Sequence, residues 1–287
     1  MRLLAVHAHP DDEASKGAGT LAKYAAEGHQ VRVLTCTGGE RGDVLNPRLK
    51  DDQFIVDNLI KVRKSEMASA VHALGISHRW LGFVDSGLPS GDPLPPLPEG
   101  CFALQGEEVV LPAMVAELRE FRPHVVTTYN EQGGYPHPDH IQTHKMTMAA
   151  LAPAADPTYR TDLGEPWQVQ KVYYDVSFAK PRIAALHEEM LRRGIDSGLA
   201  QWLQTRPDRA LRRVDARIDV HEYFPQRDGA LRAHATQIDP DGFFFMVPRE
   251  LEAEVWPWEE FELAYTAPGV QRRDGEMEDC LFAGIPR

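Results

Sequence analysis

Residues 8–13, Ala-His-Pro-Asp-Asp-Glu, place one imidazole and two adjacent carboxylates directly after the apolar residues 3–6. The apolar run is typical of a buried strand, and open α/β sheets bind their ligands at the carboxyl ends of strands. Histidine and aspartate are suitable ligands for a borderline metal such as zinc. The same residues also suit a strand-to-helix turn, in which Asp11 or Asp12 caps the helix. This segment alone does not separate the two interpretations.

A second segment of the same kind lies far downstream. Residues 133–140, Gly-Gly-Tyr-Pro-His-Pro-Asp-His, follow the predicted strand 124–129 and open a predicted helix. If the first strand is central and the chain order reverses beside it, the two segments are neighbours across the switch point. His9, Asp12 and His140 would then form a set of two histidines and one carboxylate. Such a set, with one position left open, is typical of catalytic zinc.

The remaining side chains of the two segments suit amide or ester hydrolysis. Asp11 is adjacent to the predicted ligand Asp12 and is free to act as general base. His137 is placed to stabilise a developing oxyanion, and Asp139 to keep His137 protonated and oriented. A zinc-bound water has a pKa near 7, and the metal also polarises a carbonyl. Together these residues predict metal-assisted hydrolysis.

Two other classes of protein remain open. The run from His7 to Asp12 resembles the H-x-H-x-D-H pattern of metallo-β-lactamases, but its sixth position is Asp, and that fold begins with antiparallel strands. We expect His7 to line the strand end rather than to bind metal. A non-catalytic metal- or sugar-binding protein is the other alternative, although it would need no unliganded base beside the metal.

Strands and helices alternate along the first half of the chain, which predicts an α/β fold with a mostly parallel sheet and helices on both faces. We expect one domain over residues 1–287, with a core over 1–151 and an irregular C-terminal extension over 152–287 that completes the pocket. Residues 87–100 are rich in Pro and Gly and predict a long irregular loop. The predicted strands are residues 3–6, 30–35, 79–84, 124–129 and 169–178, and the predicted helices are residues 17–27, 57–74, 112–121, 140–151, 183–193 and 229–237.

The composition excludes several classes of protein. The chain has 287 residues, 43% of them hydrophobic, and a net charge of -12, which argues against a nucleic-acid partner. No apolar run has the length of a membrane span or of a signal sequence. Cys36, Cys101 and Cys280 are widely spaced and odd in number, so we expect no disulfide framework and a cytoplasmic location. The sequence gives no indication of the oligomeric state.

The two segments, residues 8–13 and 137–140, together resemble the zinc-dependent LmbE-like (PIG-L) N-deacetylase family. The resemblance implies a Rossmann-like fold and removal of N-acyl groups from glucosamine-containing substrates. It implies that zinc, with iron(II) as the alternative, is bound by His9, Asp12 and His140. It also implies that Asp11 is the base, that His137 pairs with Asp139 as the oxyanion stabiliser, and that Tyr135 is a mobile tyrosine near the reacting carbonyl.

Longer segments are similar to the branch of this family whose members hydrolyse S-conjugates of the thiol mycothiol: residues 35–42, 80–88, 91–100, 222–225 and 234–240. Residues 265–278 are the least familiar part. The resemblance implies cleavage of the amide between N-acetylcysteine and glucosaminyl-inositol, with release of a mercapturic acid. The alternative within the family is deacetylation of N-acetylglucosaminyl-inositol or another N-acetyl sugar.

This resemblance also assigns substrate contacts. Lys16 resembles the amidase branch and is expected to contact the cysteinyl part of a small thiol conjugate. Glu40, Arg63 and Asp85 match positions that hold sugar and inositol hydroxyls, and carboxylates and guanidinium groups are suitable ligands for polyols. For Arg63, an ion pair with Glu66 on the helix surface is an equally good interpretation.

Overall fold

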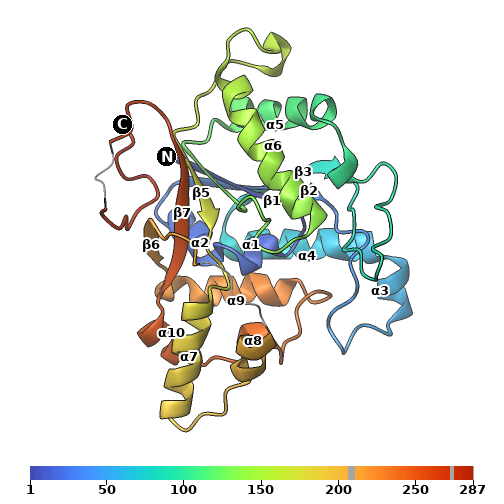
Figure 1. Ribbon diagram of the computed structural model, residues 1–287, viewed down its shortest axis with the longest axis vertical. Helices are drawn as coiled ribbons and strands as arrows, with labels where there is room; N and C mark the ends of the chain where they lie inside the picture. Colours follow the sequence, from blue (N-terminus) through green and yellow to red (C-terminus); the bar gives the residue numbers. More distant parts are fainter. Residues whose placement is uncertain (206–210, 272–274, 287) are drawn as a thin grey trace.

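In the part of the chain that the computed structural model describes, residues 1–205, 211–271 and 275–286, a seven-stranded sheet runs in the order β3-β2-β1-β4-β5-β7-β6 (Figure 1). Strands β1 to β5 are parallel to one another, whereas β7 is antiparallel to both β5 and β6. The strands are β1 (Arg2–His7), β2 (Gln30–Thr37), β3 (Ser77–Phe83), β4 (Val125–Thr128), β5 (Lys171–Asp175), β6 (Ala216–Asp219) and β7 (Trp258–Thr266).

Helices cover both faces of this sheet. The α-helices are α1 (Asp12–Ser15), α2 (Ala18–Ala26), α3 (Gln53–Asp57), α4 (Leu59–Leu74), α5 (Glu107–Phe121), α6 (Pro138–Ala155), α7 (Lys180–Arg192), α8 (Leu199–Thr205), α9 (Phe224–Ala233) and α10 (Arg249–Val255). Short 3₁₀ turns are η1 (Phe102–Leu104), η2 (Thr161–Leu163), η3 (His221–Tyr223) and η4 (Phe243–Phe245). Helices α5 and α6 lie on one side of the sheet, and α2, α4 and α9 lie on the other (Figure 1).

Strand β1 shows why both faces are covered. Successive side chains of a strand point to opposite faces, and in β1 both sets are apolar and buried. Leu3 and Ala5 belong to the hydrophobic cluster that includes α2, whereas Leu4 and Val6 belong to the cluster formed with α5 and α6. A strand buried on both faces is typical of the centre of a parallel sheet.

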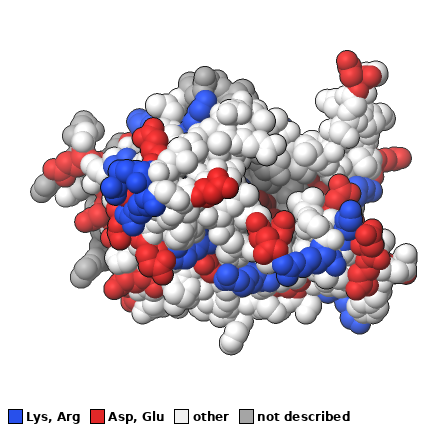
Figure 2. Space-filling model, turned by 90° about the horizontal axis from the view of Figure 1, so that it is seen from below, with Lys and Arg blue, Asp and Glu red and all other residues white. Residues whose placement is uncertain are grey.

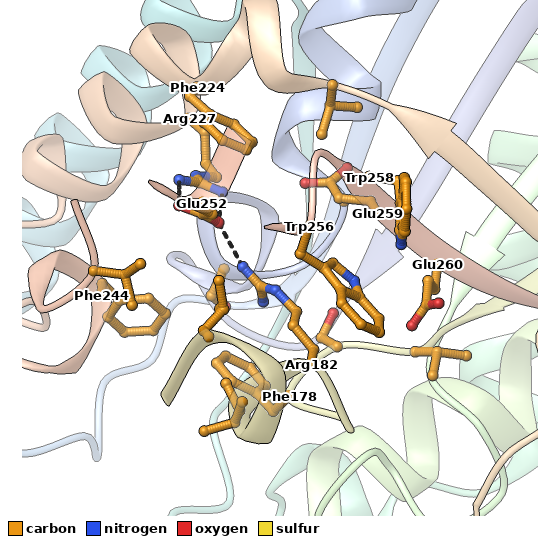
Figure 3. A pocket seen from close by; sticks show the side chains of 18 of the residues that line it. Phe178, Arg182, Phe224, Arg227, Phe244, Glu252, Trp256, Trp258, Glu259 and Glu260 are labelled. Atoms are coloured by element: carbon orange, nitrogen blue, oxygen red, sulfur yellow. Dashed lines mark hydrogen bonds and ion pairs between the residues drawn. The ribbon is translucent and has the colours of Figure 1, made fainter. Parts of the chain in front are cut away.

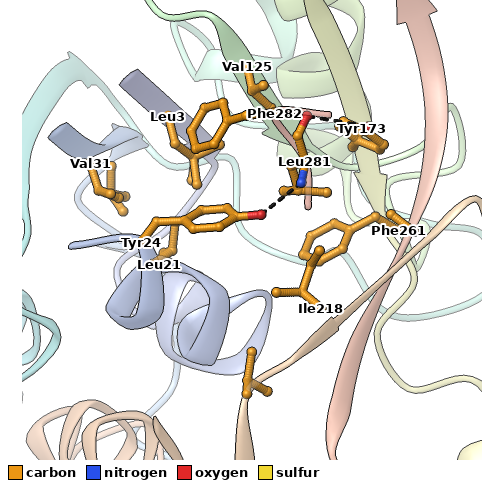
Figure 4. Close-up of a cluster of buried hydrophobic side chains, with 14 of the residues drawn as sticks. Leu3, Leu21, Tyr24, Val31, Val125, Tyr173, Ile218, Phe261, Leu281 and Phe282 are labelled. Carbon is orange, nitrogen blue, oxygen red and sulfur yellow. Dashed lines mark hydrogen bonds between the residues drawn. The ribbon is translucent and has the colours of Figure 1, made fainter. Parts of the chain in front are cut away.

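The C-terminal segment packs into the same core as the first strand. Leu281 is fully buried, and its backbone N–H donates to the Tyr24 hydroxyl at 2.7 Å (Figure 4). Phe282 packs against the Tyr24 ring with a centroid distance of 5.0 Å. Residues far apart in the sequence therefore share one hydrophobic core.

The predicted α/β class with a mostly parallel sheet is confirmed, and two details differ. The C-terminal part is not irregular, because it supplies β5, β6 and β7 and the helices α7 to α10. Strand β7 was not predicted because its polar residues interrupt the apolar pattern. Helix α5 begins at Glu107, so Pro112 lies inside the helix rather than in its first turn.

The chain order reverses beside β1. From β1 the chain proceeds outward through β2 and β3, and then returns to the other side of β1 as β4 and β5. The loops after β1 and β4 therefore begin side by side at the carboxyl edge of the sheet, which is the ligand-binding position of such folds. Residues 8–13 and 133–140 occupy these two loops.

The surface carries charges of both signs. On the face shown in Figure 2, acidic and basic side chains are interleaved, and neither sign covers the face alone. No helix among the described residues has the length and apolar character needed to span a lipid bilayer.

Candidate metal centre

The structure brings His9, Asp12 and His140 together at the switch point. The distance between His9 Nδ1 and His140 Nε2 is 3.3 Å, and Asp12 Oδ2 lies 3.6 Å from the first nitrogen and 3.5 Å from the second. Three ligands of a tetrahedral ion with bonds of about 2.0–2.1 Å stand roughly 3.4 Å apart. All three side chains are buried, with residue exposures of 8%, 3% and 0%. The spacing of the donor atoms therefore fits a single metal ion.

A hydrogen bond orients His140 for this role. Its Nδ1 lies 2.9 Å from the Gly133 carbonyl oxygen and donates to it, which leaves the Nε2 lone pair free to face the other two donors. Burial holds the pKa of His140 well below its usual value, so the ring is neutral, as a metal ligand must be. Gly133 has φ +70, and a Cβ there would lie 2.7 Å from His140 Cβ. The turn thus requires glycine for two reasons.

The carboxylates of Asp139 and Asp85 orient His9 through Nε2, the ring nitrogen that does not face the other two metal donors. Its Nε2 donates to Asp139 Oδ2 at 3.2 Å and lies 3.5 Å from Asp85 Oδ1, which leaves Nδ1 facing the centre. Ser86 donates to the Asp139 carboxylate through both its backbone N–H, at 2.9 Å, and its hydroxyl. Burial opposes a charged imidazole, but Asp12, Asp139 and Asp85 outweigh it and raise the pKa of His9. This concentration of buried negative charge favours a bound cation.

Asp12 is held through both of its oxygens. Lys16 Nζ lies 2.5 Å from Oδ1, and the Tyr129 hydroxyl donates to Oδ2 at 2.6 Å. Burial opposes ionisation, but Lys16 and His140 outweigh it and hold the pKa of Asp12 well below its usual range. The Tyr129 ring also stacks on His140, with centroids 4.1 Å apart. Asp12 is therefore a fixed, ionised ligand candidate.

Asp11 stands beside these donors but is outside the set. It is the N-cap of α1 in a left-handed conformation with φ 115, and its backbone N–H donates to Glu13 Oε2 at 3.0 Å. Arg63 bonds the Pro10 and Gly39 carbonyl oxygens, each at 2.7 Å, and lies 3.3 Å from Asp11 Oδ2. Burial raises the pKa of Asp11, and Arg63 partly offsets this effect. A fixed carboxylate with a raised pKa suits a general base.

Glu13 connects the loop of residues 8–13, which carries His9 and Asp12 and is called the metal loop below, to the C-terminal part of the chain. His234 Nε2 donates to Glu13 Oε1 at 2.5 Å, and both residues are fully buried. The second oxygen of Glu13 is the one that accepts from Asp11 N–H. Close by in sequence, Thr236 donates to Glu66 through its backbone N–H and its hydroxyl, both at 2.7 Å. Residues after position 230 therefore support the loop that carries Asp11.

His137 forms the other wall of the centre. It caps α6, and its Nδ1 accepts from the Asp139 backbone N–H at 3.2 Å, so the proton of the neutral ring is on Nε2. Its ring centroid lies 4.5 Å from that of His9. Burial lowers the pKa of His137 to about 4. Tyr135 is 37% exposed, and its ring centroid lies 6.0 Å from that of His137.

The structure corrects the expected role of Asp139. We expected this carboxylate to keep His137 protonated, but its hydrogen bonds go to His9 and Ser86. Asp139 bonds to His137 only through its backbone N–H, to a ring nitrogen that acts as acceptor. The reason is that both residues lie at the start of α6, where the capping residue receives the backbone N–H groups.

The predicted substrate-binding residues are mostly engaged within the protein. Lys16 Nζ bonds Asp12 rather than facing open space, and Arg63, 2% exposed, clamps the metal loop. Arg63 also makes no ion pair with Glu66, whose carboxylate binds Thr236. Asp85 accepts from Gly87 N–H at 2.8 Å and Arg41 N–H at 2.9 Å.

Glu40 supports the same loop and remains accessible. It accepts the Asp85 backbone N–H at 3.0 Å while its side chain is only partly buried. Glu40 and Tyr135 are therefore the predicted contact residues that the structure leaves most open to a ligand.

Sequence reasoning missed three groups of residues at this centre. Tyr129 ends the predicted strand 124–129, so its position was a usable signal. Ser86 follows β3 at the same edge of the sheet, but its position in the sequence indicates a role at the centre less clearly than that of Tyr129. His234 has no local signal in the sequence, because the packing of α9 against α1, α2 and α4 brings it to Glu13. His7, expected to line the strand end, is fully buried and lies 3.8 Å from Asp175.

Comparison with known proteins places this centre in a family. Residues 4–151 match the family model described as "PIG-L: GlcNAc-PI de-N-acetylase". The chain is 52% identical over 289 residues to a Streptomyces coelicolor protein named mycothiol S-conjugate amidase, covering 99% of this chain and 97% of that one. It is 42% identical over 303 residues to a Geodermatophilus obscurus 1D-myo-inositol 2-acetamido-2-deoxy-alpha-D-glucopyranoside deacetylase, covering 99% and 98%. The chain therefore belongs to the PIG-L family.

A solved structure confirms the fold. The N,N'-diacetylchitobiose deacetylase of Pyrococcus horikoshii superposes with a TM-score of 0.62 over 92% of this chain and 83% of the other, at 17% sequence identity. At that identity the likeness concerns the fold alone. The predicted Rossmann-like architecture and the predicted family are both confirmed.

Proposed function

We propose that this chain is a metal-dependent amidase that hydrolyses mycothiol S-conjugates, cleaving the amide between N-acetylcysteine and glucosaminyl-inositol and releasing a mercapturic acid. The observation that supports the reaction class is the buried triangle of His9, Asp12 and His140 with the unliganded carboxylate of Asp11 beside it. The 52% identity to the Streptomyces coelicolor amidase supports the substrate class.

The metal that we propose is zinc. Two imidazoles and one carboxylate are the usual protein ligands of a catalytic zinc ion. Iron(II) is the alternative, because metal availability as well as affinity decides which ion is bound. When bound, the ion would lower the pKa of a water molecule and polarise the amide carbonyl.

Asp11 is the proposed general base. It takes a proton from the water that attacks the carbonyl carbon, and its raised pKa makes it a stronger base than an exposed aspartate. Arg63 and Glu13 fix its backbone and one carboxylate oxygen. Held in this way, the carboxylate needs little reorganisation during the reaction.

His137 is the proposed oxyanion stabiliser. Because its Nδ1 accepts the Asp139 N–H, its Nε2–H is the available donor to the carbonyl oxygen as negative charge develops there. A neutral imidazole donates this hydrogen bond through its single N–H and keeps that proton. As the C–N bond breaks, the amine nitrogen takes up a proton. Asp11, which holds the proton taken from the attacking water, is one candidate donor, and His137 would be the other only in its imidazolium form.

Deacetylation of N-acetylglucosaminyl-inositol is the second candidate function, and the 42% identity to the Geodermatophilus obscurus deacetylase favours it. Side-by-side measurement of kcat/KM on a mycothiol S-conjugate and on the acetylated sugar distinguishes the two. We expect the metal-loaded protein to prefer the conjugate. The Asp11→Asn variant, purified in the same way, controls for contaminating hydrolases. A preference for the acetylated sugar would contradict the proposal.

We further propose that the whole chain acts as a single unit in the cytoplasm on this small molecule, without a nucleic-acid partner. Cys36, Cys101 and Cys280 are unpaired thiols, as is usual in a reducing compartment. The contact between His234 and Glu13 supports a C-terminal part that completes the active site rather than forming a separate domain.

A further inference from the structure

Tyr129 directly follows β4, at the edge of the sheet where the two loops that carry the predicted metal donors begin. It is fully buried, with a residue exposure of 1%. A buried tyrosine normally has a partner for its hydroxyl group, because an unpaired O–H in the interior costs free energy. The partners of this hydroxyl lie in the metal loop.

The Tyr129 hydroxyl joins the start of the metal loop to its end. It accepts the Ala8 backbone N–H at 2.7 Å and donates to Asp12 Oδ2 at 2.6 Å. The His9 backbone N–H donates to the same carboxylate oxygen at 3.0 Å. One hydroxyl group therefore connects both ends of the loop that carries two of the three predicted donors.

The ring and the backbone of Tyr129 contact the third donor and its helix. The ring stacks on His140, with centroids 4.1 Å apart and an interplanar angle of 15°. The near-parallel stack limits rotation of the imidazole ring. His144, one turn after His140 on α6, donates from Nδ1 to the Tyr129 carbonyl oxygen at 3.0 Å. Tyr129 therefore restrains both the ring of His140 and the helix that carries it.

A neutral hydroxyl group holds a carboxylate without cancelling its charge. Glu252 shows the opposite arrangement, because Arg182 and Arg227 bond its carboxylate at 2.7 and 2.8 Å (Figure 3). The charge of that carboxylate is compensated within the protein. At Asp12, Lys16 bonds only Oδ1, whereas Oδ2 accepts from the tyrosine hydroxyl and from a backbone N–H. The oxygen nearest the two imidazoles is thus fixed by neutral donors, which leaves its charge available to a cation.

We propose that Tyr129 is a positioning residue that holds the three donors, which come from two separate loops, at the separation that a metal ion requires. This inference rests on the proposed metal set of His9, Asp12 and His140. Tyr129 contacts Asp12 and His140 directly and restrains His9 through Ala8. Because Tyr129 is buried, it acts through these donors rather than on the substrate. Loss of a group that orients metal ligands typically costs about 10–100-fold in metal affinity or activity.

The test measures the dissociation constant for Zn²⁺ by competition with a chromophoric chelator, with no substrate present. Tyr129→Phe removes the hydroxyl and keeps the ring, and we expect it to weaken Zn²⁺ binding by about 10–100-fold. Tyr129→Leu, which removes the ring as well, should weaken binding further. Tyr24→Phe is the matched control, because Tyr24 is equally buried and its hydroxyl accepts the Leu281 backbone N–H at 2.7 Å. This control should lose stability in urea but keep the dissociation constant of the wild-type protein.

Substitution of Co²⁺ for Zn²⁺ supplies a spectroscopic readout, because the visible absorption of bound Co²⁺ depends on the geometry of its ligands. We expect Tyr129→Phe to change this spectrum and Tyr24→Phe to leave it as in the wild-type protein. At saturating metal, Tyr129→Phe should lower kcat on the S-conjugate and leave KM nearly unchanged, because the substrate does not contact a buried tyrosine.

Three results would overturn the role of Tyr129 while leaving the metal set in place. The first is an unchanged dissociation constant in Tyr129→Phe, and the second is an equal loss of affinity in Tyr129→Phe and Tyr24→Phe. The third is a Tyr129→Phe protein that does not fold even at saturating metal, which would make Tyr129 a structural residue. If His140→Ala binds Zn²⁺ as tightly as the wild-type protein, the proposed metal set has failed, and the role of Tyr129 fails with it.

Discussion

Replacement of Arg63 by methionine distinguishes a substrate contact from a clamp on the metal loop. In the structure the Arg63 guanidinium bonds two backbone carbonyl oxygens, of Pro10 and Gly39, and lies 3.3 Å from Asp11 Oδ2. A hydrogen bond to a charged group contributes about 1.5–3 kcal/mol, and an acceptor left unpaired in the interior adds a cost. Loss of both carbonyl bonds should therefore lower the free energy of unfolding by about 3 kcal/mol or more. The displaced Asp11 should also lower kcat.

Urea unfolding and steady-state kinetics on the same preparation test this prediction. Arg48→Met is the matched control, because Arg48 makes an exposed ion pair with Asp241, and such pairs contribute about 0–1 kcal/mol. Arg63→Lys should recover only part of the stability, since lysine lacks the two-armed geometry. If Arg63→Met unfolds like the wild-type protein and changes only KM, Arg63 is a substrate ligand and the clamp is refuted.

Two further predictions concern metal and acid. His140→Ala should lose bound metal, measured by elemental analysis after dialysis, because it removes one of three donors; tight retention of zinc would refute the ligand set. Burial opposes ionisation of Glu252, but Arg227, Arg182 and Arg249 outweigh it and lower the pKa of this carboxyl from 4.5 to about 2. The ionised carboxylate therefore stabilises the fold by about 3 kcal/mol above pH 4.5. This stabilisation is lost as the pH falls toward 2. Urea unfolding should therefore show a large difference between the wild-type protein and Glu252→Gln at pH 7 and a smaller one at pH 3; a difference independent of pH would contradict this.

Local patterns in the sequence were sufficient for the five parallel strands, β1 to β5, and for the metal triangle. Residues 8–13 and 133–140 each follow an apolar strand, and strand order alone brings such loops together. His9, Asp12 and His140 were identified by residue type and by this position. Their close approach is a property of the fold class, which is why it was predictable.

The partners of these residues were less predictable because side-chain direction depends on tertiary packing. Lys16, Arg63 and Asp85 were expected to contact substrate. In the structure Lys16 and Arg63 bond to the loop that carries His9 and Asp12, and Asp85 accepts from Gly87 and lies 3.5 Å from His9 Nε2. A charged residue near a site has the same sequence signal whether it faces the ligand or supports the loop. Likewise, nothing near His234 in the sequence indicates that it reaches Glu13.

The prediction of whole elements in the C-terminal part of the chain was limited in the same way. Strand β7 contains several glutamates, and two of them bind other parts of the protein: Glu259 caps α2 through Gly19 and Thr20, and Glu260 pairs with Arg217. Because these polar residues interrupt the apolar pattern, the strand resembled irregular chain.

The turnover of Asp11→Asn at full metal occupancy tests the central claim most directly. The amide side chain is nearly isosteric with the carboxylate but cannot accept the proton of the attacking water, and general-base catalysis contributes about 10²–10⁴-fold. We expect the variant to bind one metal ion per chain, as the wild-type protein does, and to lose at least about 100-fold in kcat on the S-conjugate. Full activity in a fully loaded Asp11→Asn variant would contradict the account.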